Sequence, residues 1–202
     1  MRPKKLSKTL VLLSASILVS VYLIFYMRIE YPHTRNIWMI QALGYTALGA
    51  LFLSLLVGSY LKVMSYFGGK IKNKPLAIAL RRHLGIVAAL FALSHFCWVM
   101  STYLRFNWEI LLELSYLRAG LVGLITLVLL LLTSFPFIIK TLKIKYWNEL
   151  HRLAYVIPLF LMQHLLLSPF ALREVSIIIS IGFALLLCTR LVPANRFKKF
   201  RE

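Results

Sequence analysis

The sequence predicts an all-α integral membrane protein, a bundle of six transmembrane helices with both termini in the cytoplasm. Its 202 residues are 60% hydrophobic and only 15% charged, whereas a soluble domain is about 45–50% apolar and about 25% charged. The charged residues stand in short clusters between long uncharged runs. Lys and Arg outnumber Asp and Glu by 24 to 6 and gather on alternate connections between those runs.

The uncharged runs predict six spans within one domain, residues 1–202. Five runs are long enough to cross about 30 Å of hydrocarbon as helices, which satisfy their own backbone groups in lipid. The first lacks a small-residue cleavage site, so we expect an uncleaved anchor rather than a signal peptide. The sixth reaches spanning length if the side chain of Arg190 extends back to the interface. The expected spans are 9–27, 38–61, 83–104, 119–139, 153–170 and 174–192.

The basic residues set the expected orientation. Nineteen of the 24 lie in the N-terminal tail, in 62–82, in 140–152 and in the C-terminal segment, and only five lie on the alternate connections. This bias places the rich segments in the cytoplasm. We therefore interpret the basic charge as membrane topology and expect no nucleic-acid partner.

Four histidines on the third and fifth spans are the most informative residues. At about 1.5 Å per residue, His95 lies roughly 18 Å outward of His83, and His164 lies roughly 20 Å outward of His151. Two matched levels result: His83 with His151 near the cytoplasmic face, and His95 with His164 in the outer half. Two histidines at one depth on different helices can supply both axial nitrogens of one haem iron, although a membrane histidine can also simply join helices by hydrogen bonds.

The inner level is the weaker candidate. Twelve residues leave His83 turned about 120° from His95, so one straight helix does not aim both at stacked haems. Pro158 lies between His151 and His164 and can change the phase of the fifth span. No Asp or Glu lies inside a span, which argues against a carboxylate proton relay. We interpret the span glycines as close-packing points between helices rather than a cofactor motif; they are Gly44, Gly49, Gly120 and Gly123.

Two stretches resemble a known family. Residues 81–86 read RRHLGI and lead to LSH at 93–95, which is similar to the "RRxLGL…LH" signature of YedZ/MsrQ proteins. Residues 147–155 read WNELHRLAY, followed by QH at 163–164, and resemble the "WxxLHRLxY…H" signature. These proteins are haem-binding membrane subunits of the bacterial periplasmic methionine sulfoxide reductase system, within the wider ferric-reductase-like transmembrane family. The resemblance covers roughly residues 40–195.

The resemblance implies six helices around haem b. One haem is expected, and a second is left open. It implies His95 and His164 as iron ligands, and His151 matches a further family histidine. His83 stands where the family pattern varies and stays a candidate cofactor contact. Family members also take up FMN at the cytoplasmic face, where we expect Arg81 and Arg82 to hold its phosphate.

The resulting hypothesis is a multi-pass electron carrier of the bacterial inner membrane, an electron-transfer subunit rather than a stand-alone enzyme. Electrons would enter from bound flavin, a cytoplasmic flavin reductase or quinol. They would leave to a periplasmic molybdopterin-containing methionine sulfoxide reductase. Two alternatives remain: a ferric or other metal-ion reductase or quinol-linked cytochrome b with another acceptor, and a non-redox six-helix membrane protein.

Overall fold

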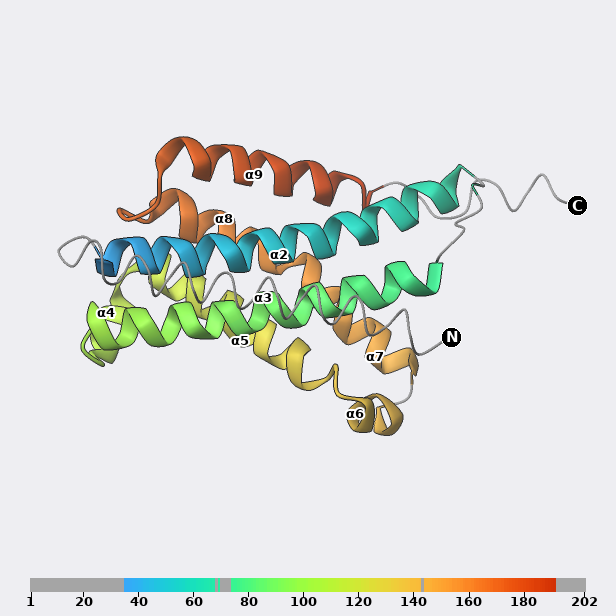
Figure 1. Cartoon of the computed structure of the whole chain (residues 1–202), viewed down its shortest axis with the longest axis horizontal. Coiled ribbons are helices and arrows are strands. Elements are labelled where there is room, and N and C mark those ends of the chain that lie inside the picture. The colour runs from blue at the N-terminus through green and yellow to red at the C-terminus, as the bar shows by residue number, and fades with distance from the viewer. Residues whose placement is uncertain (1–34, 68, 70–73, 143, 192–202) are drawn as a thin grey trace, which may run out of the picture.

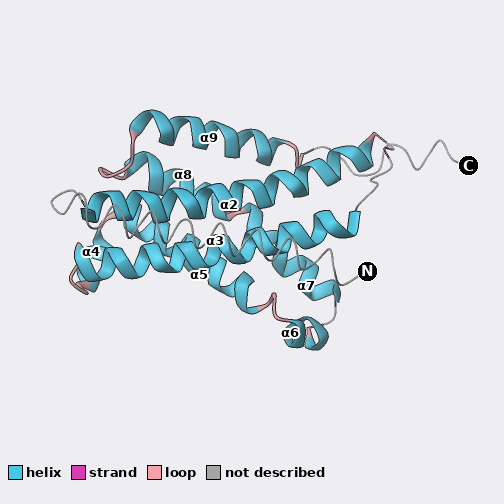
Figure 2. Cartoon of the chain, in the orientation of Figure 1, coloured by secondary structure: helices cyan, strands magenta, loops and turns pink. Residues whose placement is uncertain are grey.

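The computed structural model describes residues 35–67, 69, 74–142 and 144–191. Every regular element among them is helical (Figure 1, Figure 2). The span expected at 9–27 lies outside these residues. The elements are α2 (Arg35–Tyr66), α3 (Lys74–Thr102), α4 (Trp108–Glu113), α5 (Ser115–Leu132), α6 (Pro136–Thr141), α7 (Ile144–Leu150), the 3₁₀ helix η1 (His151–Tyr155), α8 (Ile157–Leu167) and α9 (Arg173–Cys188).

Three of these helices are long and apolar enough to cross a membrane, and residues 151–167 form a shorter apolar segment. The three cover 36–66, 74–102 and 115–132. Their outward-facing side chains include large apolar ones, since Leu53 of α2 is 48% exposed, Ile78 of α3 is 52% exposed and Ile125 of α5 is 59% exposed. Helices that are apolar on all sides are typical of a lipid environment. The prediction of a helical membrane protein is confirmed.

The core forms where α2, α3, α5, α8 and α9 meet. α2 and α3 run antiparallel along most of their length (Figure 1). Ala88 and Ala89 of α3 are 0% and 1% exposed, and such small side chains let helices approach closely in lipid. From α9, the fully buried Phe183 packs edge-on against Phe52 of α2, with ring centroids 5.5 Å apart.

The fourth expected span, 119–139, is not one helix. α5 ends at Leu132, a turn follows, and α6 begins at Pro136. Proline lacks the backbone N–H that a helix interior needs, and it disfavours the helical conformation in the preceding residue. Phe135 accordingly has extended angles, φ −68° and ψ 138°. The uncharged run is continuous in composition, but its backbone is interrupted by this proline.

The fifth expected span, 153–170, also changes character along its length. Residues His151–Tyr155 form the 3₁₀ helix, and the α-helical part begins at Ile157 with Pro158 in its first turn. Proline is tolerated there because its missing N–H would have no intrahelical partner. The change between 3₁₀ and α geometry lies between His151 and His164, as the position of Pro158 predicted.

The sixth span was expected to be completed by Arg190 reaching the interface. Instead α9 ends at Cys188, and the Arg190 guanidinium turns inward over the Tyr155 ring, with Cζ 3.9 Å from the ring centroid. The attraction of a guanidinium for an aromatic face accounts for this placement. The expectation that Arg190 snorkels is therefore wrong.

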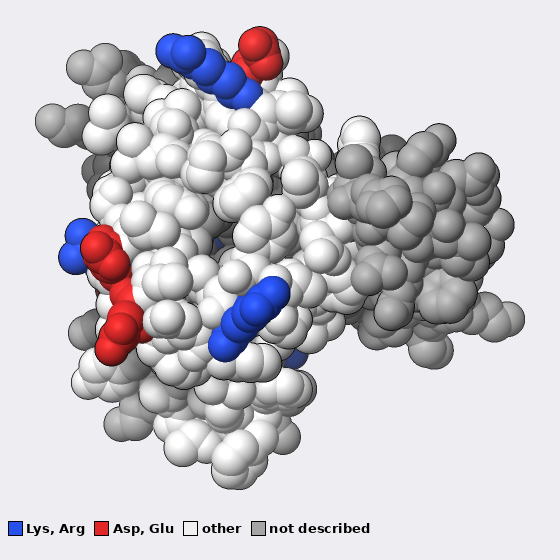
Figure 3. Space-filling model, turned by 90° about the vertical axis from the view of Figure 1, so that its left-hand side faces the viewer, with Lys and Arg blue, Asp and Glu red and all other residues white. Residues whose placement is uncertain are grey.

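The end of the molecule away from Arg190 carries the connection between α3 and α5, which contains α4. Figure 3 shows this end as a largely uncharged surface with a few separated charges of both signs. Asn107 caps α4 by accepting hydrogen bonds from the backbone N–H groups of Glu109 and Ile110. Ahead of it, Arg105 and Phe106 have positive φ angles of 47° and 60°. This short helix was not expected, because its few residues leave too little periodicity to identify.

Candidate functional site

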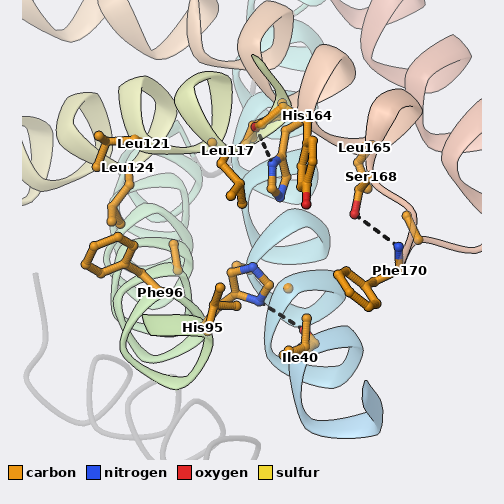
Figure 4. Close-up of a pocket in the computed structure, with 18 of the residues that line it drawn as sticks. Ile40, His95, Phe96, Leu117, Leu121, Leu124, His164, Leu165, Ser168 and Phe170 are labelled. Carbon is orange, nitrogen blue, oxygen red and sulfur yellow. Dashed lines mark hydrogen bonds between the residues drawn. The ribbon is translucent and has the colours of Figure 1, made fainter. Parts of the chain in front are cut away.

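His95 of α3 and His164 of α8 face each other across the interior of the bundle. Their ring centroids are 6.3 Å apart, and the ring planes are nearly perpendicular at 89°. Figure 4 shows one nitrogen of each ring turned toward the other histidine. The matched depths predicted this pairing from sequence positions separated by a full connection and a span.

The other nitrogen of each ring is fixed by the backbone of a neighbouring helix. His95 Nδ1 lies 3.0 Å from the carbonyl oxygen of Ile40 in α2, and His164 Nδ1 lies 2.8 Å from the carbonyl oxygen of Tyr116 in α5. A carbonyl oxygen only accepts, so Nδ1 carries the proton in both rings and Nε2 keeps its lone pair. Metal-binding histidines are held in this way, with the second nitrogen donating to a carbonyl or carboxylate.

The separation of the two rings suits one metal ion between them. Metal–imidazole bonds are about 2.0–2.1 Å long, so two imidazole rings that shared one metal ion would have centroids roughly 6 Å apart. The observed separation is 6.3 Å. No cluster of three or more His, Cys, Asp or Glu side chains that could hold a metal exists in the described part of the chain. The two histidines are therefore the ligands that the described residues offer to a metal here.

A cavity of about 330 Å³ surrounds the two rings. Its size is within the range of small-molecule and cofactor pockets, about 300–1,000 Å³. Its lining includes no Asp, Glu, Lys or Arg and is mostly aliphatic and aromatic. Labelled side chains around it in Figure 4 include Phe96, Leu117 and Leu124. The residues present suit an apolar cofactor that carries a metal within reach of the two histidines.

Two glycines allow the helices to approach the rings. A Cβ atom added at Gly44 would lie 3.2 Å from Cε1 and Nδ1 of His95, and one added at Gly120 would lie 2.8 Å from Nδ1 of His164. The sequence interpretation of these glycines as helix-packing points therefore missed a relation to the histidines. These contacts depend on how α2 and α5 are placed against α3 and α8, which the positions of the glycines along their own spans do not reveal.

The inner histidines are not brought together. His83 Nδ1 lies 2.7 Å from the carbonyl oxygen of Ala79 in its own helix. His151 Nε2 lies 3.3 Å from Thr133 Oγ1, and its ring packs on Trp147 with centroids 4.1 Å apart. Among the residues that the structure describes, no hydrogen bond or ring contact joins His83 to His151.

The two arginines expected to act together point in different directions. Arg81 Nη2 donates to Tyr155 Oη at 2.8 Å. Arg82 Nη2 donates to the carbonyl oxygen of Ser134, just after α5. Consecutive residues of a helix point about 100° apart, which accounts for the divergence.

Comparison with known protein families identifies a match to the central part of the chain. Residues 43–162 match the model of the family described as "Ferric reductase like transmembrane component". The matched segment begins in α2, just before Gly44, and includes His83, His95 and His151. It ends two residues before His164, so the pairing of His95 with His164 rests on the geometry above.

Proposed function

The chain belongs to the ferric-reductase-like transmembrane family, whose function is electron transfer in the membrane, and from this premise we propose that it carries electrons through haem b. His95 and His164 are the residues that would hold the haem iron. The observation that carries the proposal is their 6.3 Å ring separation, with each Nδ1 on a backbone carbonyl. Bound haem would supply a metal centre that changes its charge by one electron.

The chain's own residues contribute orientation and a dry environment. The carbonyl oxygens of Ile40 and Tyr116 select the tautomer that leaves Nε2 available and hold each ring against rotation. The mostly apolar lining, which includes no Asp, Glu, Lys or Arg, would keep counter-charges away from a bound metal, and low polarity around a metal site is one determinant of its redox potential. Gly44 and Gly120 keep the neighbouring helix backbones close to the rings without a clash.

The donor and acceptor follow from the sequence resemblance. We propose that electrons enter at the cytoplasmic face from flavin, a flavin reductase or quinol, and leave to a periplasmic molybdopterin-containing methionine sulfoxide reductase. The localisation would be the bacterial inner membrane, with lipid around the bundle. FMN at the inner end would complete this scheme. The description of the matched family names ferric reductase. Reduction of a metal ion outside the membrane is therefore the second candidate function.

A visible spectrum of the purified protein tests the haem proposal. We expect the Soret band and, after reduction, the α band of haem b, as well as a strong loss of both in His95→Ala and His164→Ala. Gln163→Ala is the matched control, since Gln163 is an exposed neighbour of His164. A colourless protein that does not take up added haem would contradict the redox proposal and favour a structural role for the histidines. Full haem content in either histidine variant would contradict the pairing.

A further inference from the structure

The cavity around His95 and His164 has hydroxyl and amide side chains toward one end only. That end, the α4 end, is where α4 lies beside the starts of α2, α5 and α9 and the ends of α3 and α8 (Figure 1). The hydroxyl and amide side chains of the lining all come from these helix ends; they are Gln41, Tyr45, Tyr103, Tyr116 and Ser168. The lining farther from α4 is aliphatic and includes Leu48, Leu51, Leu124 and Leu127. The cavity therefore suits an amphipathic ligand whose polar groups lie at the α4 end.

The connection between α8 and α9 is fixed to α2 and α3 at this end. Gln41 Nε2 donates to the carbonyl oxygen of Phe170 at 2.8 Å, and the backbone N–H of Leu172 donates to Tyr45 Oη at 2.9 Å. The rings of Tyr103 and Phe170 meet edge-on, with centroids 4.7 Å apart. The side chains at the α4 end are thus held in place by the fold itself, which lowers the entropy cost of ordering them around a ligand.

These contacts leave hydrogen-bond donors available in the cavity. The oxygens of Tyr45 and Ser168 both accept from backbone N–H groups, the second from Phe170 at 3.4 Å (Figure 4). A hydroxyl group also has one hydrogen to donate, and a primary amide has two. Among the described residues, neither hydroxyl hydrogen is donated to an acceptor, and Gln41 Nε2 uses one of its two. This end of the cavity therefore suits a ligand with acceptor oxygens.

The charges near the α4 end favour an anionic acceptor. A second cavity of about 430 Å³ shares Leu165, Ser168 and Ala171 with the first, and its lining adds the exposed Arg173. Among the described residues, no Asp or Glu lines either cavity. A positive charge beside hydrogen-bond donors attracts a negative group, and hydrogen bonds to a carboxylate are about twice as strong as those between neutral groups.

We propose that Tyr45, Ser168 and Gln41 bind the carboxylates of haem b at the α4 end of the cavity. This inference rests on the proposed haem function and adds residues that contact the edge of the cofactor rather than its iron. Haem b has both carboxylates on one edge of an otherwise apolar ring, and the cavity is divided in the same way. Carboxylates among the leucines farther from α4 would lose their hydration without gaining hydrogen bonds, which is costly.

The test compares haem b with its dimethyl ester, in which both carboxylates are capped and uncharged. Each compound is titrated into the full-length apoprotein in detergent, and the dissociation constant is obtained from the Soret absorbance. Wild type is compared with Tyr45→Phe and Ser168→Ala, which remove one hydroxyl each. Tyr60→Phe is the matched control, because Tyr60 belongs to the same helix as Tyr45, is 53% exposed and lines neither cavity.

Tyr45→Phe should weaken haem b by about tenfold, as expected for one lost hydrogen bond to a charged group, and should change the affinity for the ester much less. If Tyr45 served only to hold the α8–α9 connection, both compounds would be weakened equally. Ser168→Ala should shift the ratio of the two dissociation constants in the same direction, and it decides the question if Tyr45→Phe does not fold.

Two outcomes separate this inference from the proposed function. If both compounds bind and their ratio of dissociation constants in Tyr45→Phe and Ser168→Ala equals that in Tyr60→Phe, the carboxylates lie elsewhere and this inference is overturned alone. If wild type binds neither compound, the haem function is overturned and this inference with it.

Discussion

Substituting Gly120 by alanine should weaken haem binding without unfolding the protein. The added methyl carbon would lie 2.8 Å from Nδ1 and 3.0 Å from Cε1 of His164. Ordinary contacts between such atoms are about 3.5 Å, so the ring must retreat by roughly 0.6 Å. The Nδ1 atom that meets the methyl group is the one bonded to the carbonyl oxygen of Tyr116, so this hydrogen bond is strained at the same time.

A displacement of this size exceeds what ligation tolerates, since binding constellations must be held within about 0.5 Å of the productive geometry. Losing a backbone partner of a metal-binding histidine typically lowers metal affinity by about 10–100-fold. We therefore expect a fall of that order in haem affinity. Alanine also has the higher helix propensity by about 1 kcal/mol, so α5 itself is not weakened.

Gly49→Ala is the matched control, because a Cβ atom at Gly49 would meet nothing within 4 Å. Haem affinity is measured by titrating haem into the apoprotein and quantified as the pyridine haemochrome, with the unfolding temperature followed in parallel. Gly49→Ala should bind haem like wild type, and Gly44→Ala should show a smaller defect, since its closest contact is 3.2 Å. Equal affinity in Gly120→Ala and Gly49→Ala would show that His164 is not the ligand that this geometry requires.

Two further predictions concern topology and stoichiometry. A fluorescent reporter fused after Glu202 should be active, and alkaline phosphatase at the same point silent, because the bias in Lys and Arg predicts that the basic segments face the cytoplasm. The reverse pattern would invert the proposed direction of electron flow. Pyridine haemochrome analysis should give about one haem per chain. This ratio should not change in His83→Leu, because His83 is hydrogen-bonded within its own helix. Two haems per chain in wild type, falling to one in His83→Leu, would show that His83 is a ligand after all.

The sequence predicted the helical membrane class and the depth of His95 and His164, because both depend on quantities that run along the chain. Charge spacing marks where a segment enters and leaves the membrane, and the rise per residue converts position into depth. The direction in which a side chain points around the helix axis is harder to obtain from sequence. The 100° step between neighbouring residues sends Arg82 to Ser134 while Arg81 reaches Tyr155.

The features that sequence reasoning missed depend on contacts between segments far apart in the chain. The inward turn of Arg190 requires an aromatic ring contributed by η1. The early end of α5 could have been anticipated from Pro136. The expected span was instead defined by the length of the uncharged run, which this single residue does not interrupt. The role of Gly120 depends on where α8 places its histidine, which no property of α5 alone reveals.

The use of backbone carbonyls to hold the two histidines has a consequence for how this protein can vary. Every amino acid has the same carbonyl group, so the side chains at positions 40 and 116 can change without removing the acceptors for His95 and His164. Mutation can disturb the ring positions only by moving α2 or α5 as a whole, or by adding bulk beside the rings. The orientation of the two rings is thus set by the helix packing itself, and the chain should tolerate substitution around them better than a pair of histidines ordered by side-chain partners would.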